Sequence, residues 1–357
     1  MAEDQTSGGV VKRAFGAQNR NRLIDMYFSG LSGPTLESAS AWSHVYRLLL
    51  WADQTTGLAH CYESDKSQPG KNWYARSLAF HDWASAALGS APSTLAQNID
   101  WLFRRATADL AAEVLKNAVR VSNKGTKQQE PYAGRDFPKP GEDPELISIV
   151  REVLGEHFHT EPPADKWQYL VQRVRQYLAL ENKRKNLVGE GFEDVLSHVI
   201  RRSCRGPDVD VRARRLLHDI RGFNRNRQGE KPNKVDVAVV RPRMRTLITA
   251  KWSVRADREK QFTSDFNDYV SAESDGTPFE YVFITNEFDP ARLARACEKL
   301  AVNAPMFTRV VHISTDAVRA TYGASQEPTM RQVLAHIESG RLISLGKWLE
   351  QLNSAAA

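Results

Sequence analysis

Cysteine is scarce in this sequence. Cys61, Cys204 and Cys297 are the only three among 357 residues, and they lie far apart. Because no C-x-x-C pair occurs, neither a disulfide framework nor a zinc ribbon is indicated. This use of cysteine is typical of proteins in a reducing compartment.

Long apolar runs are missing as well. No stretch approaches the length that spans a membrane, and the opening residues, MAEDQTSGGVVKR, contain no apolar core of a signal peptide. Together with the cysteine pattern, these absences lead us to expect a cytoplasmic protein.

The composition is that of an ordinary globular protein with an uneven excess of positive charge. Apolar residues make up 41% and charged residues 26%, and the formal net charge is +6. The length is sufficient for two domains with cores of their own. Five basic clusters fall between Lys183 and Arg245, namely KRKNL, RRSCR, RARR, RGFNRNR and RPRMR. Such a face favours nucleic acid, since bound phosphates release counterions, and a merely solvated surface is the alternative.

Two short runs rich in β-branched residues form the centre of the chain. VDVAVV (Val235 to Val240) and TLITA (Thr246 to Ala250) have the composition of strands, and the Pro- and Arg-containing connection between them predicts a hairpin. The first run contains Asp236, and Lys251 follows the second. A carboxylate and an amine at one edge of a sheet suit metal-assisted phosphodiester hydrolysis, because a hard cation needs oxygen ligands and the lysine can orient a water. A surface hairpin that carries both residues by chance is the alternative.

The residues that follow this lysine form a recognisable order. Arg255, Asp257 and Arg258 lie four, six and seven residues after Lys251, as R-x-D-R, and Asp265 lies fourteen after it. This order resembles the type II restriction endonucleases that read a CCGG core, the NgoMIV, SgrAI and BsaWI group of the PD-(D/E)XK nuclease superfamily. The similarity is specific but covers only about thirty residues.

The segment departs from that group in its displaced acid and in a proline, which in the group adjoins the first aspartate and here is Pro232, four positions ahead of Asp236. The group has a neutral residue two positions before the lysine, and here it is Thr249. The displaced acid of the group is usually Glu, whereas here it is Asp265, whose side chain is shorter by one methylene. Three other acids remain as substitutes for it: Glu259, Asp268 and Glu273.

The resemblance also implies a further acid on a helix that precedes the strands. Glu193 in GEGFEDVL is the match, and Glu190 is the alternative. By resemblance, Asp236, Asp265 and Glu193 would bind Mg²⁺, and Lys251 would lie beside the attacking water.

Base recognition, by the same resemblance, would fall to the R-x-D-R residues. An arginine matches O6 and N7 of guanine and an aspartate accepts from N4 of cytosine, so Arg255, Asp257 and Arg258 can read C·G and G·C pairs. A homodimer or higher homo-oligomer would read a palindrome with a CCGG core and cut it to leave 5′ overhangs. A cognate DNA methyltransferase is expected in the same system, though not as a physical partner. The alternatives are a structure-specific or repair nuclease on the same fold and an inactive DNA-binding protein.

The fold expected is α/β (α+β), with an all-helical N-terminal domain followed by a nuclease domain. Apolar residues recur at helical spacing up to about residue 118, which predicts a helical domain over 1–121, and the Pro-, Gly- and charge-rich stretch 122–144 is typical of a linker. Residues 145–357 predict a PD-(D/E)XK-like mixed central sheet flanked by helices. Strands are expected at Phe279 to Thr285 and at Arg309 to Ser314, and a helical end over TMRQVLAHIESGRLISLGKWLEQL.

Overall fold

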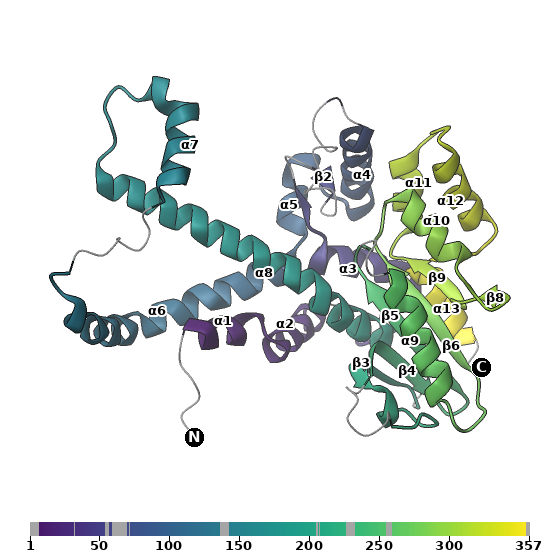
Figure 1. The fold of residues 1–357 in the computed structure, drawn as a ribbon. Helices are drawn as coiled ribbons and strands as arrows, with labels where there is room; N and C mark the ends of the chain where they lie inside the picture. The colour runs from purple at the N-terminus through teal and green to yellow at the C-terminus, as the bar shows by residue number, and fades with distance from the viewer. Residues whose placement is uncertain are drawn as a thin grey trace. The chain divides into compact units, whose positions relative to one another are not determined.

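A computed structural model describes most of the chain (Figure 1). The described residues are 7–31, 33–53, 57–58, 70, 72–135, 143–204, 206, 208–225, 233–254 and 259–354. The chain divides into two compact units, the first formed by Met1–Phe15 and Thr107–Leu187 and the second by Gly16–Ala106 and Val188–Ala357. The central sheet belongs to the second unit.

Six strands form this sheet in the order β10-β9-β6-β5-β4-β3. Their bounds are β3 Asp210–Leu216, β4 Lys234–Arg241, β5 Met244–Lys251, β6 Phe279–Thr285, β9 Arg309–His312 and β10 Leu342–Ser344. Strands β3, β4 and β5 pair antiparallel, whereas β5, β6, β9 and β10 pair parallel. The mixed central sheet predicted from the sequence is therefore confirmed.

Strands β4 and β5 form the expected hairpin. Arg241 pairs with Met244, so only the two residues Pro242 and Arg243 lie between the strands. Both strands are rich in Val, Ile and Thr, which suit a pleated, buried surface. Six of the eight residues of β5 are buried, as expected where both faces of a sheet are covered.

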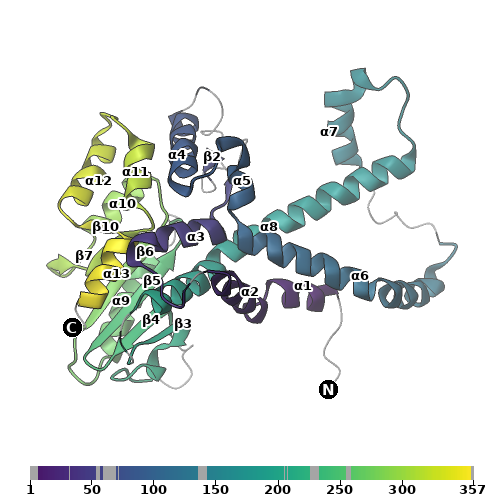
Figure 2. The same ribbon diagram turned by 180° about the vertical axis from the view of Figure 1, so that it is seen from behind.

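Helices cover both faces. Helix α9 (Glu259–Ala272) lies on one face (Figure 1), and α13 (Leu345–Ser354) lies on the other (Figure 2). Phe262 of α9 packs against Phe283 of β6, with ring centroids 5.2 Å apart. The Leu352 carbonyl of α13 accepts a hydrogen bond of 2.6 Å from Arg241 of β4. The other helices of eight or more residues that lie wholly in this unit are α2 Ala17–Ser29, α3 Ala41–Leu49, α4 Asn72–Leu88, α10 Pro290–Glu298, α11 Thr315–Tyr322 and α12 Pro328–Glu338. Smaller elements are α5 Leu95–Asn98 and the strand pair β7 Leu300–Ala301 with β8 Ala304–Pro305.

The expectation of a continuous helical end is wrong. Helix α12 ends at Glu338, Gly340 adopts a positive φ of 73°, and β10 then pairs parallel with β9 before α13 begins. A strand of three residues is too short to show an alternation of apolar and polar residues, and pairing with β9 stabilises it. Strand β3 was likewise not anticipated, because its sequence DVRARRL resembles a basic surface cluster.

The N-terminal region also differs from the expectation. It is mostly helical, but β1 Ala52–Asp53 and β2 Gly57–Leu58 form a short antiparallel pair, so the region is not all-helical. The two compact units have bounds of their own, and the domain ranges 1–121 and 145–357 stay predictions. Helix α6, Trp101–Gln129, continues past residue 121, because proline first interrupts the sequence at Pro131.

The first unit is built from helices. It contains α1 Ser7–Phe15, α7 Pro144–Leu154 and parts of α6 and of the 40-residue α8, Ala164–Ser203. Asp143 caps α7 by accepting a 3.0 Å hydrogen bond from the Leu146 N–H. None of the described helices combines the length and apolar content that a membrane crossing requires.

Candidate active site

Asp236 and Lys251 lie together where β4 and β5 separate. The Lys251 Nζ donates a 2.7 Å hydrogen bond to Asp236 Oδ2, and both side chains are partly exposed, at 26% and 21%. The β4–β5 pairing runs from the turn to Val237↔Ile248, so Asp236 is the next residue of β4 and lies opposite Thr249. Lys251 is the last residue of β5. The sequence pair thus forms a direct contact at one end of the sheet.

The same carboxylate oxygen is held by the strand beside it. Asp236 Oδ2 also accepts from the Ala250 N–H at 2.9 Å and from the Thr249 hydroxyl at 3.3 Å. The neutral residue before the lysine therefore contacts the aspartate. Two neighbouring residues of β5 thus fix the carboxylate of Asp236.

Glu193 brings a second carboxylate to this group from α8. Burial, and then the charge of Asp236, raise the pKa of Glu193 to about 7, whereas Arg214 and Lys251 act in the opposite direction. The Glu193 side chain is 13% exposed, and Arg214 Nη1 donates to its Oε2 at 3.1 Å. Glu190, the alternative on the same helix, instead accepts from Arg20 at 2.8 Å and is 64% exposed. The structure therefore places Glu193, rather than Glu190, within electrostatic reach of Asp236.

Asp265 supplies a third carboxylate from α9. Burial and the charge of Asp236 raise the pKa of Asp265 to about 6, while Lys251 lowers it. Two of its possible substitutes are engaged elsewhere, since Glu259 binds Arg295 at 2.7 Å and Glu273 binds Arg245 at 3.1 Å. The third, Asp268, contributes to the raised pKa of Asp265. Asp265 thus interacts electrostatically with both Asp236 and Lys251.

The donor set suits a hard divalent cation. Two partly buried carboxylates with raised pKa values mean that negative charge is costly here, and a cation would relieve that cost. In the described residues, no three acidic, histidine or cysteine side chains converge as a ready-made cage. Mg²⁺ does not require one, because it is usually held by one or two carboxylates together with waters and substrate phosphates. The residues present therefore fit Mg²⁺ held jointly with a phosphate.

The proposed base-reading residues Arg255, Asp257 and Arg258 lie outside the described residues. The chain just before them is firmly held. Val254 N–H donates at 2.7 Å to Glu287 Oε2, and Glu287 is completely buried. The Trp252 carbonyl also accepts from the Asn286 N–H at 3.0 Å. The loop after β6 thus sets the path that the chain takes from Lys251 to Val254.

Several arginines of the basic clusters are used inside the fold. Arg215 binds Asp210 at 2.6 Å with a side chain that is 15% exposed, and Arg241 and Arg245 are buried. The expectation that these clusters form one basic face is therefore corrected for these residues. A cluster of arginines in sequence cannot show whether each side chain faces solvent or a buried carbonyl.

Sequence reasoning missed three residues that surround Glu193. Asp194 is 1% exposed and lies between Arg20 and Arg214, to both of which it is hydrogen-bonded. The RARR cluster contains Arg214, but its partners come from α8 and cannot be read from the cluster itself. The one available signal was the Glu-Asp pair in GFEDVL, which puts two acids on one helix turn.

Comparisons with known proteins add little to this geometry. No protein-family model and no curated protein matches the chain. Among solved structures, metal-depleted Ecl18kI in complex with uncleaved, modified DNA is similar at 12% identity and a TM-score of 0.31. The match covers 95% of this chain and 85% of that one. A likeness this weak does not establish a shared fold or activity.

Proposed function

We propose that this protein is a Mg²⁺-dependent type II restriction endonuclease of the PD-(D/E)XK kind. One observation carries the proposal: Lys251 contacts Asp236 at 2.7 Å, and two further carboxylates with raised pKa values lie within their field. Groups whose pKa values are perturbed by burial and by a specific charge are candidates for catalysis. In further support, helix α8 precedes the β4–β5 hairpin, and α9 and β6 follow it, which suits the mixed sheet flanked by helices that the resemblance implies.

The chain's own residues would act on a water and a phosphodiester. Asp236, Asp265 and Glu193 would hold Mg²⁺, which supplies a Lewis acid at the scissile phosphate. Lys251, as an ammonium that donates to Asp236, would orient the attacking water and offset the charge that grows on the phosphate. Asp236, which Thr249 and Ala250 keep in place, would maintain the lysine beside that water. In-line attack would leave a 5′-phosphate and a 3′-hydroxyl.

Sequence recognition belongs to the same proposal. Arg255, Asp257 and Arg258 would read a CCGG core, and a two-fold homodimer or larger homo-oligomer would match the palindrome and leave 5′ overhangs. In support, the chain reaches Arg255 from a segment fixed by Glu287, and a rigid approach favours precise base contacts. Protection of host DNA would then call for a cognate methyltransferase.

The direct test is cleavage of a long unmethylated DNA of known sequence in Mg²⁺ by the full chain and by Lys251→Ala. We expect discrete cuts at palindromes that contain CCGG, and a loss of roughly 10³-fold in the variant's rate. Lys347→Ala is the matched control, because Lys347 is an exposed lysine on α13. Mapping the fragment ends would give the flanking bases and the overhang.

Other outcomes would support the competing functions. Cleavage that ignores sequence would favour a structure-specific or repair nuclease. DNA binding without cleavage in either Mg²⁺ or Mn²⁺ would favour an inactive DNA-binding protein. Full activity in Lys251→Ala would remove this lysine from the mechanism.

A further inference from the structure

Arg214 occupies a strained position directly beside the candidate site. Strand β3 pairs Ala213 with Val237 and Arg215 with Val235, so Arg214 lies opposite Asp236 of β4. Its backbone φ is 53°, in the left-handed region that favours glycine. A non-glycine residue in this region is uncommon, and such strain persists only where the surroundings maintain it.

The Arg214 guanidinium crosses from the sheet to helix α8. Its Nη1 donates to Glu193 Oε2 at 3.1 Å and to the Glu190 carbonyl at 3.2 Å, and its Nη2 donates to Asp194 Oδ1. One planar group therefore holds two neighbouring carboxylates and a backbone carbonyl of the same helix turn. A guanidinium offers several donors in fixed directions, which a lysine cannot reproduce.

Asp194 is in turn held from the other side. Arg20 on α2 donates from Nε to Asp194 Oδ2 at 2.7 Å, and the side chains of both residues are at most 5% exposed. A buried carboxylate between two guanidinium groups has little freedom to move. The pair Arg20 and Asp194 thus gives Arg214 a rigid support, and Glu193 is attached to that support through Arg214.

We propose that Arg214 is a positioning residue of the candidate site, which holds the Glu193 carboxylate toward Asp236 so that it can serve a divalent cation. The inference rests on the proposed function and deepens it. Arg214 itself touches neither water nor phosphate in this role. The strained backbone is retained because the side chain must leave β3 beside Asp236 and reach α8.

The test uses the full chain and two charge-removing variants, Arg214→Gln and Arg214→Gly. Glycine relaxes the backbone at φ 53°, so it keeps a folded variant available if glutamine impairs folding. Arg319→Gln is the control, because Arg319 lies on α11, outside the basic clusters, is 44% exposed and pairs with Glu338. Melting curves establish folding first. Cleavage is then measured at saturating DNA over a range of Mg²⁺ concentrations.

We expect Arg214→Gln to raise the half-saturating Mg²⁺ concentration by about 10–100-fold, the usual effect of removing a residue that orients a metal ligand. DNA affinity measured in Ca²⁺ and the control should stay unchanged. Arg214→Lys should restore only part of the metal affinity. The decisive comparison is with Glu193→Gln: if Arg214 acts through Glu193, adding Arg214→Gln to that variant should have no further effect.

The outcomes separate the two proposals. If the wild-type chain cleaves DNA but Arg214→Gln responds to Mg²⁺ as the wild type does, or adds fully to Glu193→Gln, the positioning role is refuted while the nuclease stands. If the wild-type chain does not cleave, the proposed function fails. Binding of Mn²⁺ alone, followed by electron paramagnetic resonance, still tests whether Arg214 and Glu193 share one cation site, and equal Mn²⁺ affinity in all variants overturns the inference.

Discussion

The two ends of the central sheet carry charged residues in opposite electrostatic conditions. At the end where Lys251 closes β5, burial and the neighbouring Asp236 raise the pKa values of Glu193 and Asp265. At the other end, where β5 begins, the pKa of Asp275 is lowered, first by a hydrogen bond from the Thr277 N–H. Raised carboxylate pKa values signal unrelieved negative charge, whereas a lowered one signals a stabilised anion.

Arg245 neutralises the acidic side chains at the second end of the sheet. Its side chain is 4% exposed, and it binds Glu273 at 3.1 Å and Asp275 at 3.3 Å. It also donates to the Arg221 carbonyl at 2.9 Å and to the Thr277 carbonyl. The charge at this end is satisfied by the protein itself, so it serves the fold.

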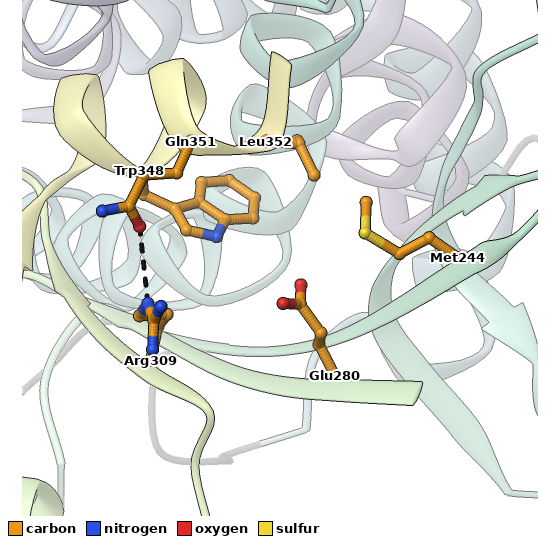
Figure 3. A pocket seen from close by; sticks show the side chains of 6 residues that line it. All are labelled: Met244, Glu280, Arg309, Trp348, Gln351 and Leu352. Carbon is orange, nitrogen blue, oxygen red and sulfur yellow. Dashed lines mark hydrogen bonds between the residues drawn. The ribbon is translucent and has the colours of Figure 1, made fainter. Parts of the chain in front are cut away.

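A hollow of about 320 Å³ opens near this second end (Figure 3). Its lining residues are Met244, Glu280, Arg309, Trp348, Gln351 and Leu352. Within it, Arg309 donates to Gln351 at 3.4 Å, and Glu280 accepts from the Thr246 hydroxyl at 3.1 Å. A concave surface with charged residues is therefore a weaker mark of a reaction site than acids whose charges oppose one another. The state of the charges, more than the shape of the surface, is therefore what marks the Lys251 end as the candidate site.

The largest effect on stability is expected for Arg245→Met. This variant leaves Glu273 and two carbonyls without their buried partner, and breaking a buried ion pair costs about 3–5 kcal/mol. Denaturant unfolding would measure the loss. The cleavage rate per folded molecule should stay unchanged, because the residue lies at the end of β5 opposite Lys251. A folded Arg245→Met variant that no longer cleaves DNA would show that this end of the sheet also takes part in the reaction. Arg212→Gln is the control for stability, with an expected change in the free energy of unfolding of less than about 0.5 kcal/mol.

The comparison also shows how much sequence could reveal. Asp236 and Lys251 were found because a hairpin brings residues fifteen apart into contact, and local composition specifies a hairpin. Glu193 and Asp265 were named by resemblance, and their roles stay predictions even though both lie in the field of Asp236. Contacts formed by local pairing were thus within reach of sequence reasoning.

Contacts between residues far apart in the sequence could not be predicted from the sequence. Arg20 meets Asp194 across 174 residues, and Arg245 meets Glu273 across 28, so neither contact has a local pattern. The three-residue β10 forms only because β9 lies beside it. Basic clusters were interpreted as one surface because sequence does not record which arginines turn inward.

The next effect concerns protons and Mg²⁺ at the Lys251 end. The pKa values of Glu193 and Asp265 are raised above their ordinary values of 4.5 and 3.8, to about 7 and about 6. Between about pH 4 and pH 7 the folded state therefore binds more protons than the unfolded state, so stability should fall as the pH rises through this window. Mg²⁺ needs the ionised carboxylates and should stabilise the protein more at about pH 8 than at about pH 5.5.

Melting temperatures in Mg²⁺ and in EDTA at several pH values would measure this linkage. Mass action gives a stabilisation of roughly 1–3 kcal/mol when the cation is present well above its dissociation constant. The double variant Glu193→Gln with Asp265→Asn should show neither the pH slope nor the Mg²⁺ effect. An equal Mg²⁺ effect at all pH values would mean that the cation binds elsewhere.

The smallest effect is expected in the hollow at the opposite end. Arg309 is exposed, and its replacement in Arg309→Gln should change the free energy of unfolding by less than about 0.5 kcal/mol and leave the cleavage rate as in the wild type. Denaturant unfolding and the Mg²⁺-dependent cleavage assay would measure both quantities side by side with Lys251→Ala. A strong loss of cleavage in Arg309→Gln would make both ends of the sheet part of the reaction. If the cleavage rate of Arg309→Gln is unchanged, then an arginine with a protein partner at one end of the sheet is not needed for cleavage, whereas Lys251 at the other end is.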